Sequence, residues 1–193
     1  MVREGSVRLP VAVIADRQSD GIGSRGNGWI GEEGDLFVSI AISQGDLPTD
    51  LPLPSASIYF GWIFMESLRN LGADVWLKWP NDIYTADGKV GGVITHRVAG
   101  AVVTGVGIDL VEKREDFTFL DIGAGPYEIL HEALEMIVSG PSWKDIFRKY
   151  RLEFGKNEGY SFHTEDGKAD MKDACLQDDG SLLINGKRIY SLR

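Results

Sequence analysis

The sequence has a single cysteine and three histidines, so it offers little material for a disulfide framework or a zinc centre. Cys175 cannot form an internal disulfide and is predicted to be a small core residue on a strand. His96, His131 and His163 are scattered along the chain and share no cluster of cysteine or carboxylate ligands. The sequence therefore does not predict a zinc site, and it leaves the ligands of any other metal unknown.

Long hydrophobic runs are also missing. The longest uncharged apolar stretch lies around residues 58–65, well short of the roughly 20 residues that a membrane-spanning helix needs. Residues 1–5 contain no apolar core of a signal peptide. These features predict a cytoplasmic protein that has no membrane partner.

Basic residues are scarce, with 20 Lys and Arg against 29 Asp and Glu in 193 residues, which gives a net charge of −9 at pH 7. Such a surface repels phosphate backbones, so we expect no nucleic-acid partner. The few bases before Lys78 are all arginines, and Arg25 stands out because it lies in a glycine-rich loop. The length allows one main core with a small appendage.

The hydrophobic pattern predicts a mixed α/β (α+β) fold. Apolar runs at 11–15 and 36–42 indicate buried strands on either side of a glycine-rich loop at 21–34. Helical spacing of apolar residues predicts a helix that ends near Gly72. The pattern further predicts an antiparallel meander over 75–108, and then two helices, which begin at 126 and 142.

From about residue 155 the pattern changes to short apolar pieces that Asp-Gly and Asn-Gly turns interrupt. This texture predicts a small all-β cap, too small to be stable unless it packs on the rest. We therefore expect a catalytic-type domain over 1–154, with a largely antiparallel sheet flanked by helices, and a β cap over 155–193.

The segment 21–26 matches the dinucleotide pattern G-x-G-x-x-G, but it leads into a strand rather than a helix. A Rossmann site is disfavoured, because no helix N-terminus is there to receive a pyrophosphate. The glycines still offer backbone N–H groups and close approach to a ligand. Gln18 adds an amide, Arg25 a cation and Trp29 a flat face. A flexible hairpin tip would explain the same glycines.

The segment 78–82, Lys-Trp-Pro-Asn-Asp, is the most distinctive stretch. Lys78 ends an apolar strand and is expected to turn toward a site, because burying an unpaired ammonium is costly. An ordinary exposed lysine in a turn is the alternative. Gly91–Gly92 and the segment 105–109 place glycines inside apolar strands, which indicates a close backbone approach by a ligand or by packing.

In this order, Gln18, the loop 21–29, the segment 78–82, Gly91–Gly92 and the segment 105–109 resemble the motifs of biotin–protein ligases. The resemblance covers roughly residues 11–109. It implies synthesis of biotinyl-5′-adenylate from biotin and ATP with Mg²⁺. It further implies transfer of biotin to a lysine of a biotin carboxyl carrier domain, such as that of acetyl-CoA carboxylase. The family also carries a small SH3-like domain after the catalytic domain, which fits the predicted β cap.

The resemblance also implies roles for individual residues. Lys78 and Arg25 would be catalytic, with Lys78 touching the biotin carboxyl and the α-phosphate. The implied biotin contacts are Gln18, Gly21, Ile22, Gly23, Ser24, Lys78, Gly92, Gly105 and Gly107. The implied ATP contacts are Arg25, Asn27, Trp29, Asn81 and Asp109.

The sequence departs from the family pattern in the loop and at the start. Ile22 and Ser24 replace two arginines, Asn27 stands where another arginine is common, and Asp109 replaces an asparagine. The strand and helix that carry a Ser-Thr biotin contact in the family are not found before residue 5, and no DNA-binding domain precedes the resemblance.

Two other functions stay open on these residues. A lipoate ligase or lipoyl transferase shares the fold, although Lys-Trp-Pro-Asn-Asp followed by Gly-Gly speaks against it. A non-catalytic biotin- or carrier-binding protein would fit the missing arginines and the short start. Members of the family can pair through sheet edges, so the resemblance also allows a homodimer.

Overall fold

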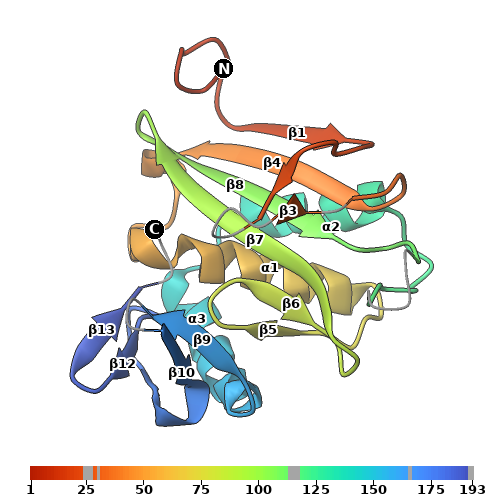
Figure 1. Ribbon diagram of the computed structural model, residues 1–193. Coiled ribbons are helices and arrows are strands. Elements are labelled where there is room, and N and C mark those ends of the chain that lie inside the picture. Colours follow the sequence, from red (N-terminus) through yellow and green to blue (C-terminus); the bar gives the residue numbers. More distant parts are fainter. Residues whose placement is uncertain (24–27, 30, 113–117, 165–166, 191–193) are drawn as a thin grey trace.

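A six-stranded antiparallel sheet forms the centre of the computed structural model, which describes residues 1–23, 28–29, 31–112, 118–164 and 167–190 (Figure 1). The strand order is β1-β4-β8-β7-β6-β5. The strands are β1 (Val11–Ala15), β4 (Leu36–Ser43), β5 (Trp76–Lys78), β6 (Asp82–Tyr84), β7 (Lys89–Val98) and β8 (Ala101–Ile108). The expected antiparallel meander over 75–108 is confirmed.

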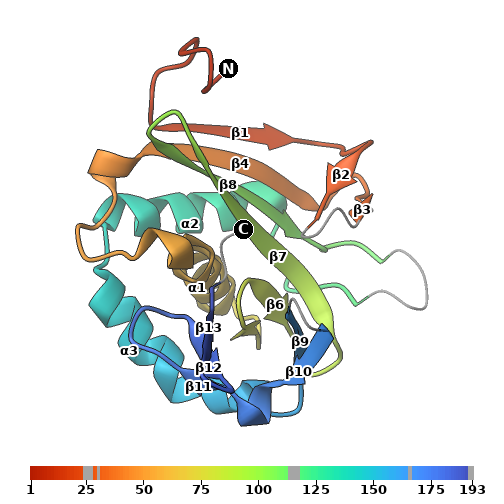
Figure 2. The same cartoon turned by 60° about the vertical axis from the view of Figure 1, so that its left-hand side comes forward.

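Helices cover one face of this sheet. α1 (Ala56–Asn70) and α2 (Pro126–Ser139) lie against it, and α3 (Trp143–Glu153) packs beside α1 (Figures 1 and 2). α2 begins at a proline and ends at Gly140, whose φ of 61° is the left-handed cap that favours glycine. The Ser142 hydroxyl accepts a hydrogen bond from the Asp145 N–H at 3.1 Å and caps α3. None of the helices in the described ranges is long and apolar enough to cross a membrane.

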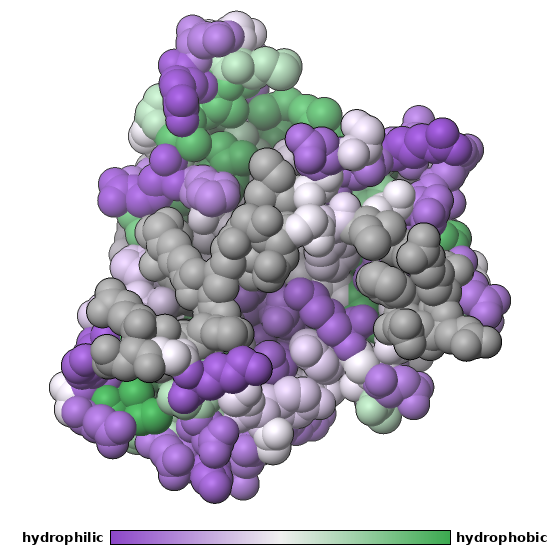
Figure 3. All heavy atoms as spheres, in the orientation of Figure 1, coloured by the Kyte–Doolittle hydropathy of each residue, from purple (hydrophilic) through white to green (hydrophobic). Residues whose placement is uncertain are grey.

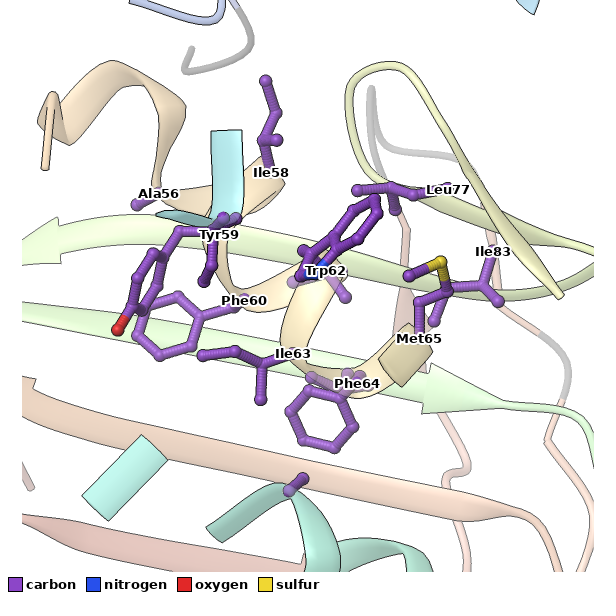
Figure 4. Packing of buried hydrophobic residues seen from close by; sticks show 14 of the residues in the cluster. Ala56, Ile58, Tyr59, Phe60, Trp62, Ile63, Phe64, Met65, Leu77 and Ile83 are labelled. Atoms are coloured by element: carbon purple, nitrogen blue, oxygen red, sulfur yellow. The ribbon is translucent and has the colours of Figure 1, made fainter. Parts of the chain in front are cut away.

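The core lies between α1 and the sheet, and Figure 4 shows the side chains of α1 that fill it. Trp62, Phe60 and Phe64 are all buried, and each such side chain contributes about 1.5–3 kcal/mol of burial free energy. α1 can approach β5 closely because Gly61 has no side chain: a Cβ there would lie 2.9 Å from Leu77 Cδ1. The helices thus occupy one face of the sheet and leave the other for a site.

The C-terminal segment forms small β sheets, as expected. Its strands are β9 (Ser161–Thr164), β10 (Gly167–Asp170), β11 (Cys175–Leu176), β12 (Leu182–Ile184) and β13 (Lys187–Ile189). β10 was not expected from the apolar pattern, because its residues are mostly polar and exposed. The prediction that Cys175 is buried is wrong: it is exposed, because β11 is a two-residue edge strand.

This segment shares the core of the rest of the molecule. Phe162, Met171 and Leu182 are buried and belong to the same hydrophobic cluster as α1. The C-terminal segment therefore packs on the rest of the molecule, and the dependence of its stability on this packing stays a prediction. The division at residues 154 and 155 stays a prediction.

Trp79 joins the two parts through its polar groups. Its indole N–H donates to the Gly180 carbonyl at 3.0 Å, and its backbone N–H donates to Asn157 Oδ1 at 2.8 Å. Gly180 has a φ of 80°, and a Cβ there would lie 2.7 Å from Ser55 Oγ at the start of α1. The turn around Gly180 is thus docked between Trp79 and α1, which requires glycine.

An ion pair between α1 and α3 generates a prediction about stability. Arg69 donates two hydrogen bonds to the Glu153 carboxylate, at 2.8 and 2.7 Å, and these hold the pKa of Glu153 below its ordinary 4.5. We expect Glu153→Gln to lower the free energy of unfolding by about 1 kcal/mol at pH 7, because a charge-assisted pair is lost at a partly exposed site.

The pH dependence follows from the direction of this shift. A lowered folded pKa gives stability that is present above the unfolded pKa and lost as the pH falls through the folded value. The difference between wild type and Glu153→Gln, measured by urea unfolding, should therefore shrink below pH 4.5. The exposed Glu158→Gln is the control. A difference that stays constant down to acid pH would contradict this explanation.

Candidate active site

A row of paired residues crosses the open face of the sheet. It runs from Lys78 through Asp82, Gly92 and Gly107 to Phe37 on neighbouring strands. Directly paired residues point to the same face, so all five belong to the face opposite α1. Since the two central members are glycines, the middle of the row is hollow. Gly105 leaves a second gap on β8, two residues away from Gly107.

These gaps open into a cavity of about 220 Å³. Figure 3 shows the same side of the molecule, where hydrophobic residues gather near the N-terminal end and hydrophilic ones cover much of the rest. Apolar side chains and backbone form most of the walls, with a few polar groups among them. The lining residues are Val13, Ala15, Gln18, Gly23, Trp29, Phe37, Val38, Ser39, Asn81, Lys89, Gly92, Ile94, Gly105, Val106 and Gly107.

Trp29 lies directly on the glycine floor. The short strands β2 (Gly21–Ile22) and β3 (Gly28–Trp29) pair Gly21 with Trp29, and a Cβ on Gly21 would lie 2.5 Å from the Trp29 carbonyl oxygen. A Cβ on Gly107 would lie 2.8 Å from Trp29 Cε2. The indole Nε1 is buried and has no hydrogen-bond partner among the described residues. Both glycines are thus needed for the ring to reach the sheet.

Lys89 supplies the ammonium group of the cavity wall. Its Nζ lies 2.6 Å from Asp82 Oδ1 and 5.4 Å from the centre of the Trp29 ring, where a cation–π contact adds to the ion pair. A Cβ on Gly92 would lie 3.5 Å from this Nζ, so the ion pair sits directly above Gly92. One end of the cavity therefore combines a positive charge with an aromatic face.

Lys78 lies at the end of the row, beside Asp82. Its Nζ lies 3.9 Å from Asp82 Oδ2 and 5.4 Å from the ring centres of Tyr84 and Tyr160, and it is not a lining residue of the cavity. The backbones of Lys78 and Gly107 are three strand spacings apart, which is roughly 14 Å. Lys78 is drawn inward to the carboxylate that also pairs with Lys89, and its contact with a biotin carboxyl stays a prediction.

The predicted site residues Asn81 and Asp109 lie in different places, and only Asn81 lines the cavity. Asn81 lines the cavity, and its Nδ2 donates to the Val93 carbonyl at 2.7 Å. Asp109 is buried at the end of β8, where its backbone N–H donates to the Val90 carbonyl at 2.8 Å, and it does not line the cavity. Among the predicted residues of the loop, Ser24, Arg25 and Asn27 lie outside the described residues. For Ile22 only the backbone is described, and it pairs with Gly28.

Sequence reasoning missed Lys89 because of a β-bulge. Strict alternation would place Lys89 and Gly92 on opposite faces. The register shifts between Ile83 and Tyr84, so that Tyr84 pairs with Lys89 while Asp82 pairs with Gly92. The extra residue brings Lys89 onto the open face. Val13, Phe37, Ser39 and Ile94 were missed as well. Phe37 pairs with Gly107, Ser39 and Ile94 pair with Gly105, and Val13 pairs with Ser39, so only the register of the sheet reveals them.

The described part of the chain holds no group of three or more His, Cys, Asp or Glu side chains placed to bind a metal. Asp82, the acidic group beside the cavity, is already paired with Lys89. Asp82 therefore acts as a counter-ion of Lys89. The arrangement can hold a ligand with an apolar body and an anionic end, the body on the glycine floor and the anion beside Lys89.

Comparison with known proteins agrees with this geometry. Residues 3–110 match the family model described as the biotin/lipoate A/B protein ligase family, which is more than half of the chain. The chain belongs to this family. The match includes the cavity wall, the bulge with Lys89 and the segment 78–82, so the site described above is part of the family domain.

The curated relatives include ligase/repressor proteins and a ligase that is named for biotin. The bifunctional ligase/repressor BirA of Salmonella typhimurium is 33% identical over 205 residues, which cover 98% of this chain and 60% of that protein. A biotin–[acetyl-CoA-carboxylase] ligase of Mycobacterium tuberculosis is 30% identical over 58% of this chain and 46% of its own length. The chain thus spans about 60% of the length of the BirA relatives that it matches.

Solved structures extend the likeness to the whole chain. The crystal structure of biotin acetyl coenzyme A carboxylase synthetase from Helicobacter pylori with bound biotinylated ATP has a TM-score of 0.92 and 39% identity. The match covers 98% of this chain and 90% of that one. A biotin protein ligase from Aquifex aeolicus has a TM-score of 0.73 at 24% identity, over 100% of this chain and 90% of that one, which supports the fold.

The contact between Trp29 and Gly107 generates a prediction about the site in the absence of ligand. We expect Gly107→Ala to push the indole off the floor, because the new methyl group would meet the ring at 2.8 Å. The chain has five tryptophans, so a ¹H–¹⁵N spectrum should show one indole N–H signal that moves strongly. Trp29→Phe assigns that signal by removing it.

The matched control for this spectrum is Gly155→Ala, since nothing lies within 4 Å of a Cβ at that position. This variant should leave all the indole signals in place. An unchanged Trp29 signal in Gly107→Ala would show that the ring does not rest on β8.

Proposed function

We propose that this chain attaches biotin to a specific lysine of a biotin carboxyl carrier domain through biotinyl-5′-AMP. The observation that carries the proposal is the cavity itself, which joins an apolar, glycine-floored pocket to the Lys89 ammonium and the Trp29 ring. The likeness to a Helicobacter pylori enzyme whose structure holds biotinylated ATP, at 39% identity, supports it. Membership of the biotin/lipoate ligase family supports the reaction class.

In the first step a biotin carboxylate oxygen attacks the α-phosphorus of ATP. The new O–P bond replaces the bond to pyrophosphate, which leaves. In the second step the carrier lysine amine attacks the acyl carbon and loses a proton, and AMP departs with the electron pair of the cleaved C–O bond. Both steps need anionic groups held together, and a fixed cation stabilises the charge on the oxygens as each bond changes.

We assign this cation to Lys89 in place of the expected Lys78. Lys89 lines the cavity, whereas Lys78 lies on the far side of Asp82. Gln18, Gly23, Gly92, Gly105 and Gly107 are proposed to contact biotin, with Gly21 holding Trp29 and Gln18 in place. Trp29 and Asn81 are proposed to lie toward the nucleotide.

The other expected contacts stay predictions. Arg25 is proposed as a second catalytic cation and phosphate contact, and Asn27, Ser24 and Ile22 belong to the same loop. Asp109 is buried and is not among the residues that line the cavity, and its ATP contact stays a prediction. The domain division, a homodimer and a cytoplasmic location also remain predictions. Because no acidic cluster gathers among the described residues, we propose that Mg²⁺ enters with the ATP phosphates as part of the substrate.

Two other functions are tested beside this one. A lipoate ligase is considered because the family name includes lipoate. A non-catalytic binding protein is considered because the loop lacks the usual arginines. One experiment separates them. The protein is incubated with ATP, labelled biotin and an apo carrier domain, and in parallel with lipoate and a lipoyl domain. Labelling of the biotin carrier supports the proposal. Labelling with lipoate alone, or biotin binding without labelling, would replace it with the ligase for lipoate or with the non-catalytic binding protein.

The role of Lys89 is testable by a single substitution. We expect Lys89→Met to reduce biotin-dependent exchange of pyrophosphate into ATP by about 100-fold, because the charge that stabilises the departing and attacking oxygens is lost. Lys168→Met, at an exposed position of β10, serves as the control and should keep full exchange. If Lys89→Met retained wild-type exchange, the cation of the site would have to come from elsewhere, and the loop residue Arg25 would be the next candidate.

A further inference from the structure

Ser39 lies in the cavity wall, on the strand beside the glycine-rich β8 (Figure 1). It is the one exposed residue of β4, whose other residues are buried or, at Ser43, half-buried. The Ser39 hydroxyl finds no hydrogen-bond partner in the part of the chain that the structure describes. A polar group of a mainly apolar cavity is therefore open to a ligand.

The neighbours of Ser39 across the sheet offer no polar side chain. A second row of directly paired residues crosses the open face, and its members are Val13, Ser39, Gly105 and Ile94. A Cβ on Gly105 would lie 3.2 Å from Ile94 Cγ1, so Ile94 leans over this glycine from one side and Ser39 borders it on the other. Ser39 thus supplies the hydrogen-bonding side chain of this row.

Ser39 and Lys89 lie at opposite ends of the cavity. The Lys89 ammonium lies above Gly92, which pairs with Gly107 on β8. Ser39 pairs with Gly105, two residues away on the same strand. Two strand spacings across the sheet and two residues along it separate the backbones of Ser39 and Gly92, which is roughly 12 Å. An elongated acid that places its carboxylate at Lys89 therefore brings its far end toward Ser39.

A ligand that fills the cavity takes the Ser39 hydroxyl away from water. This costs free energy unless the ligand offers a hydrogen-bonding group in place of water. The two acids in the family name differ in this respect. The far end of biotin is a fused ring with a ureido group, which has an acceptor oxygen and N–H donors, whereas the far end of lipoate is a dithiolane without them. A hydroxyl can both donate to and accept from a ureido group.

We infer that Ser39 determines the specificity of this site: its hydroxyl hydrogen-bonds the ureido group of biotin and thereby disfavours acids whose far end is apolar. The inference rests on the proposed function, since it places the carboxylate of the ligand at Lys89. It adds to that function a residue that selects between the two acids of the family name.

The test compares biotin with acids that differ from it at the far end. Desthiobiotin keeps the ureido group and lacks the sulfur, whereas thiolane-2-pentanoic acid keeps the sulfur ring and lacks the ureido group. Titration of the full chain with labelled biotin, and displacement of that label by each acid, gives the affinities of strong and weak ligands alike. We expect Ser39→Ala to weaken biotin and desthiobiotin by about fivefold each, as for one lost neutral hydrogen bond. Thiolane-2-pentanoic acid should bind as it does to wild type.

Ser43→Ala is the matched control, because Ser43 lies on the same strand and the same face but does not line the cavity. It should bind all three acids like wild type. Ser39→Thr keeps a hydroxyl and should keep the wild-type preference for acids with a ureido group. Equal weakening of all three acids by Ser39→Ala, or no weakening of any, would overturn the inference. If the wild-type chain binds none of them, the proposed function fails first, and that result is distinct from a failure of the Ser39 argument.

Discussion

The Asp82 carboxylate between two lysines is the interaction on which the site depends. It lies 2.6 Å from Lys89 Nζ and 3.9 Å from Lys78 Nζ, on a strand whose neighbour contributes the bare backbone of Gly92. A single lysine beside an apolar cavity would be drawn toward water, because its stem is flexible and its ammonium is strongly hydrated. Here a short ion pair ties Lys89 to the sheet, and the same carboxylate also lies near the Lys78 ammonium.

The cavity exists because large side chains pack on one face of the sheet, whereas glycines lie on the other. Large side chains from α1 fill one face, where Leu77 and Ile83 point away from the site (Figure 4). On the other face, glycines at 92, 105 and 107 remove the side chains that alternation would place there. Glycine inside a strand lowers the stability of the strand, because it loses more conformational entropy on folding than other residues. The core on the opposite face offsets this loss of stability, so that the strands can form the floor of the site without side chains on it.

The sequence was a good guide to the sheet and a poorer one to its open face. Short apolar runs separated by turns predicted the meander, and glycines inside apolar strands predicted a close backbone approach at Gly92 and Gly107. Lys89 could not be found in this way, because the bulge opposite Tyr84 changes which side chains share a face. Lys78 was correctly expected to be drawn inward, but which partner would receive it depends on Tyr160, about 80 residues away in the chain. Cys175 was misjudged for a similar reason, since only the tertiary structure shows that its strand lies at an edge.

The segment 78–82 is distinctive because it serves the fold and the chemistry together. Trp79 points to the C-terminal segment and donates to Gly180 and Asn157, whereas Asn81 and Asp82 point to the cavity and its cation. Neighbouring residues of the segment thus contact different parts of the molecule. For this reason the segment identifies the architecture more firmly than the activity: a binding protein of the same fold would need Trp79 just as much. A ligase would differ from such a protein in the positive charge at its cavity, which Lys89 supplies among the described residues, because its chemistry needs anionic groups held together.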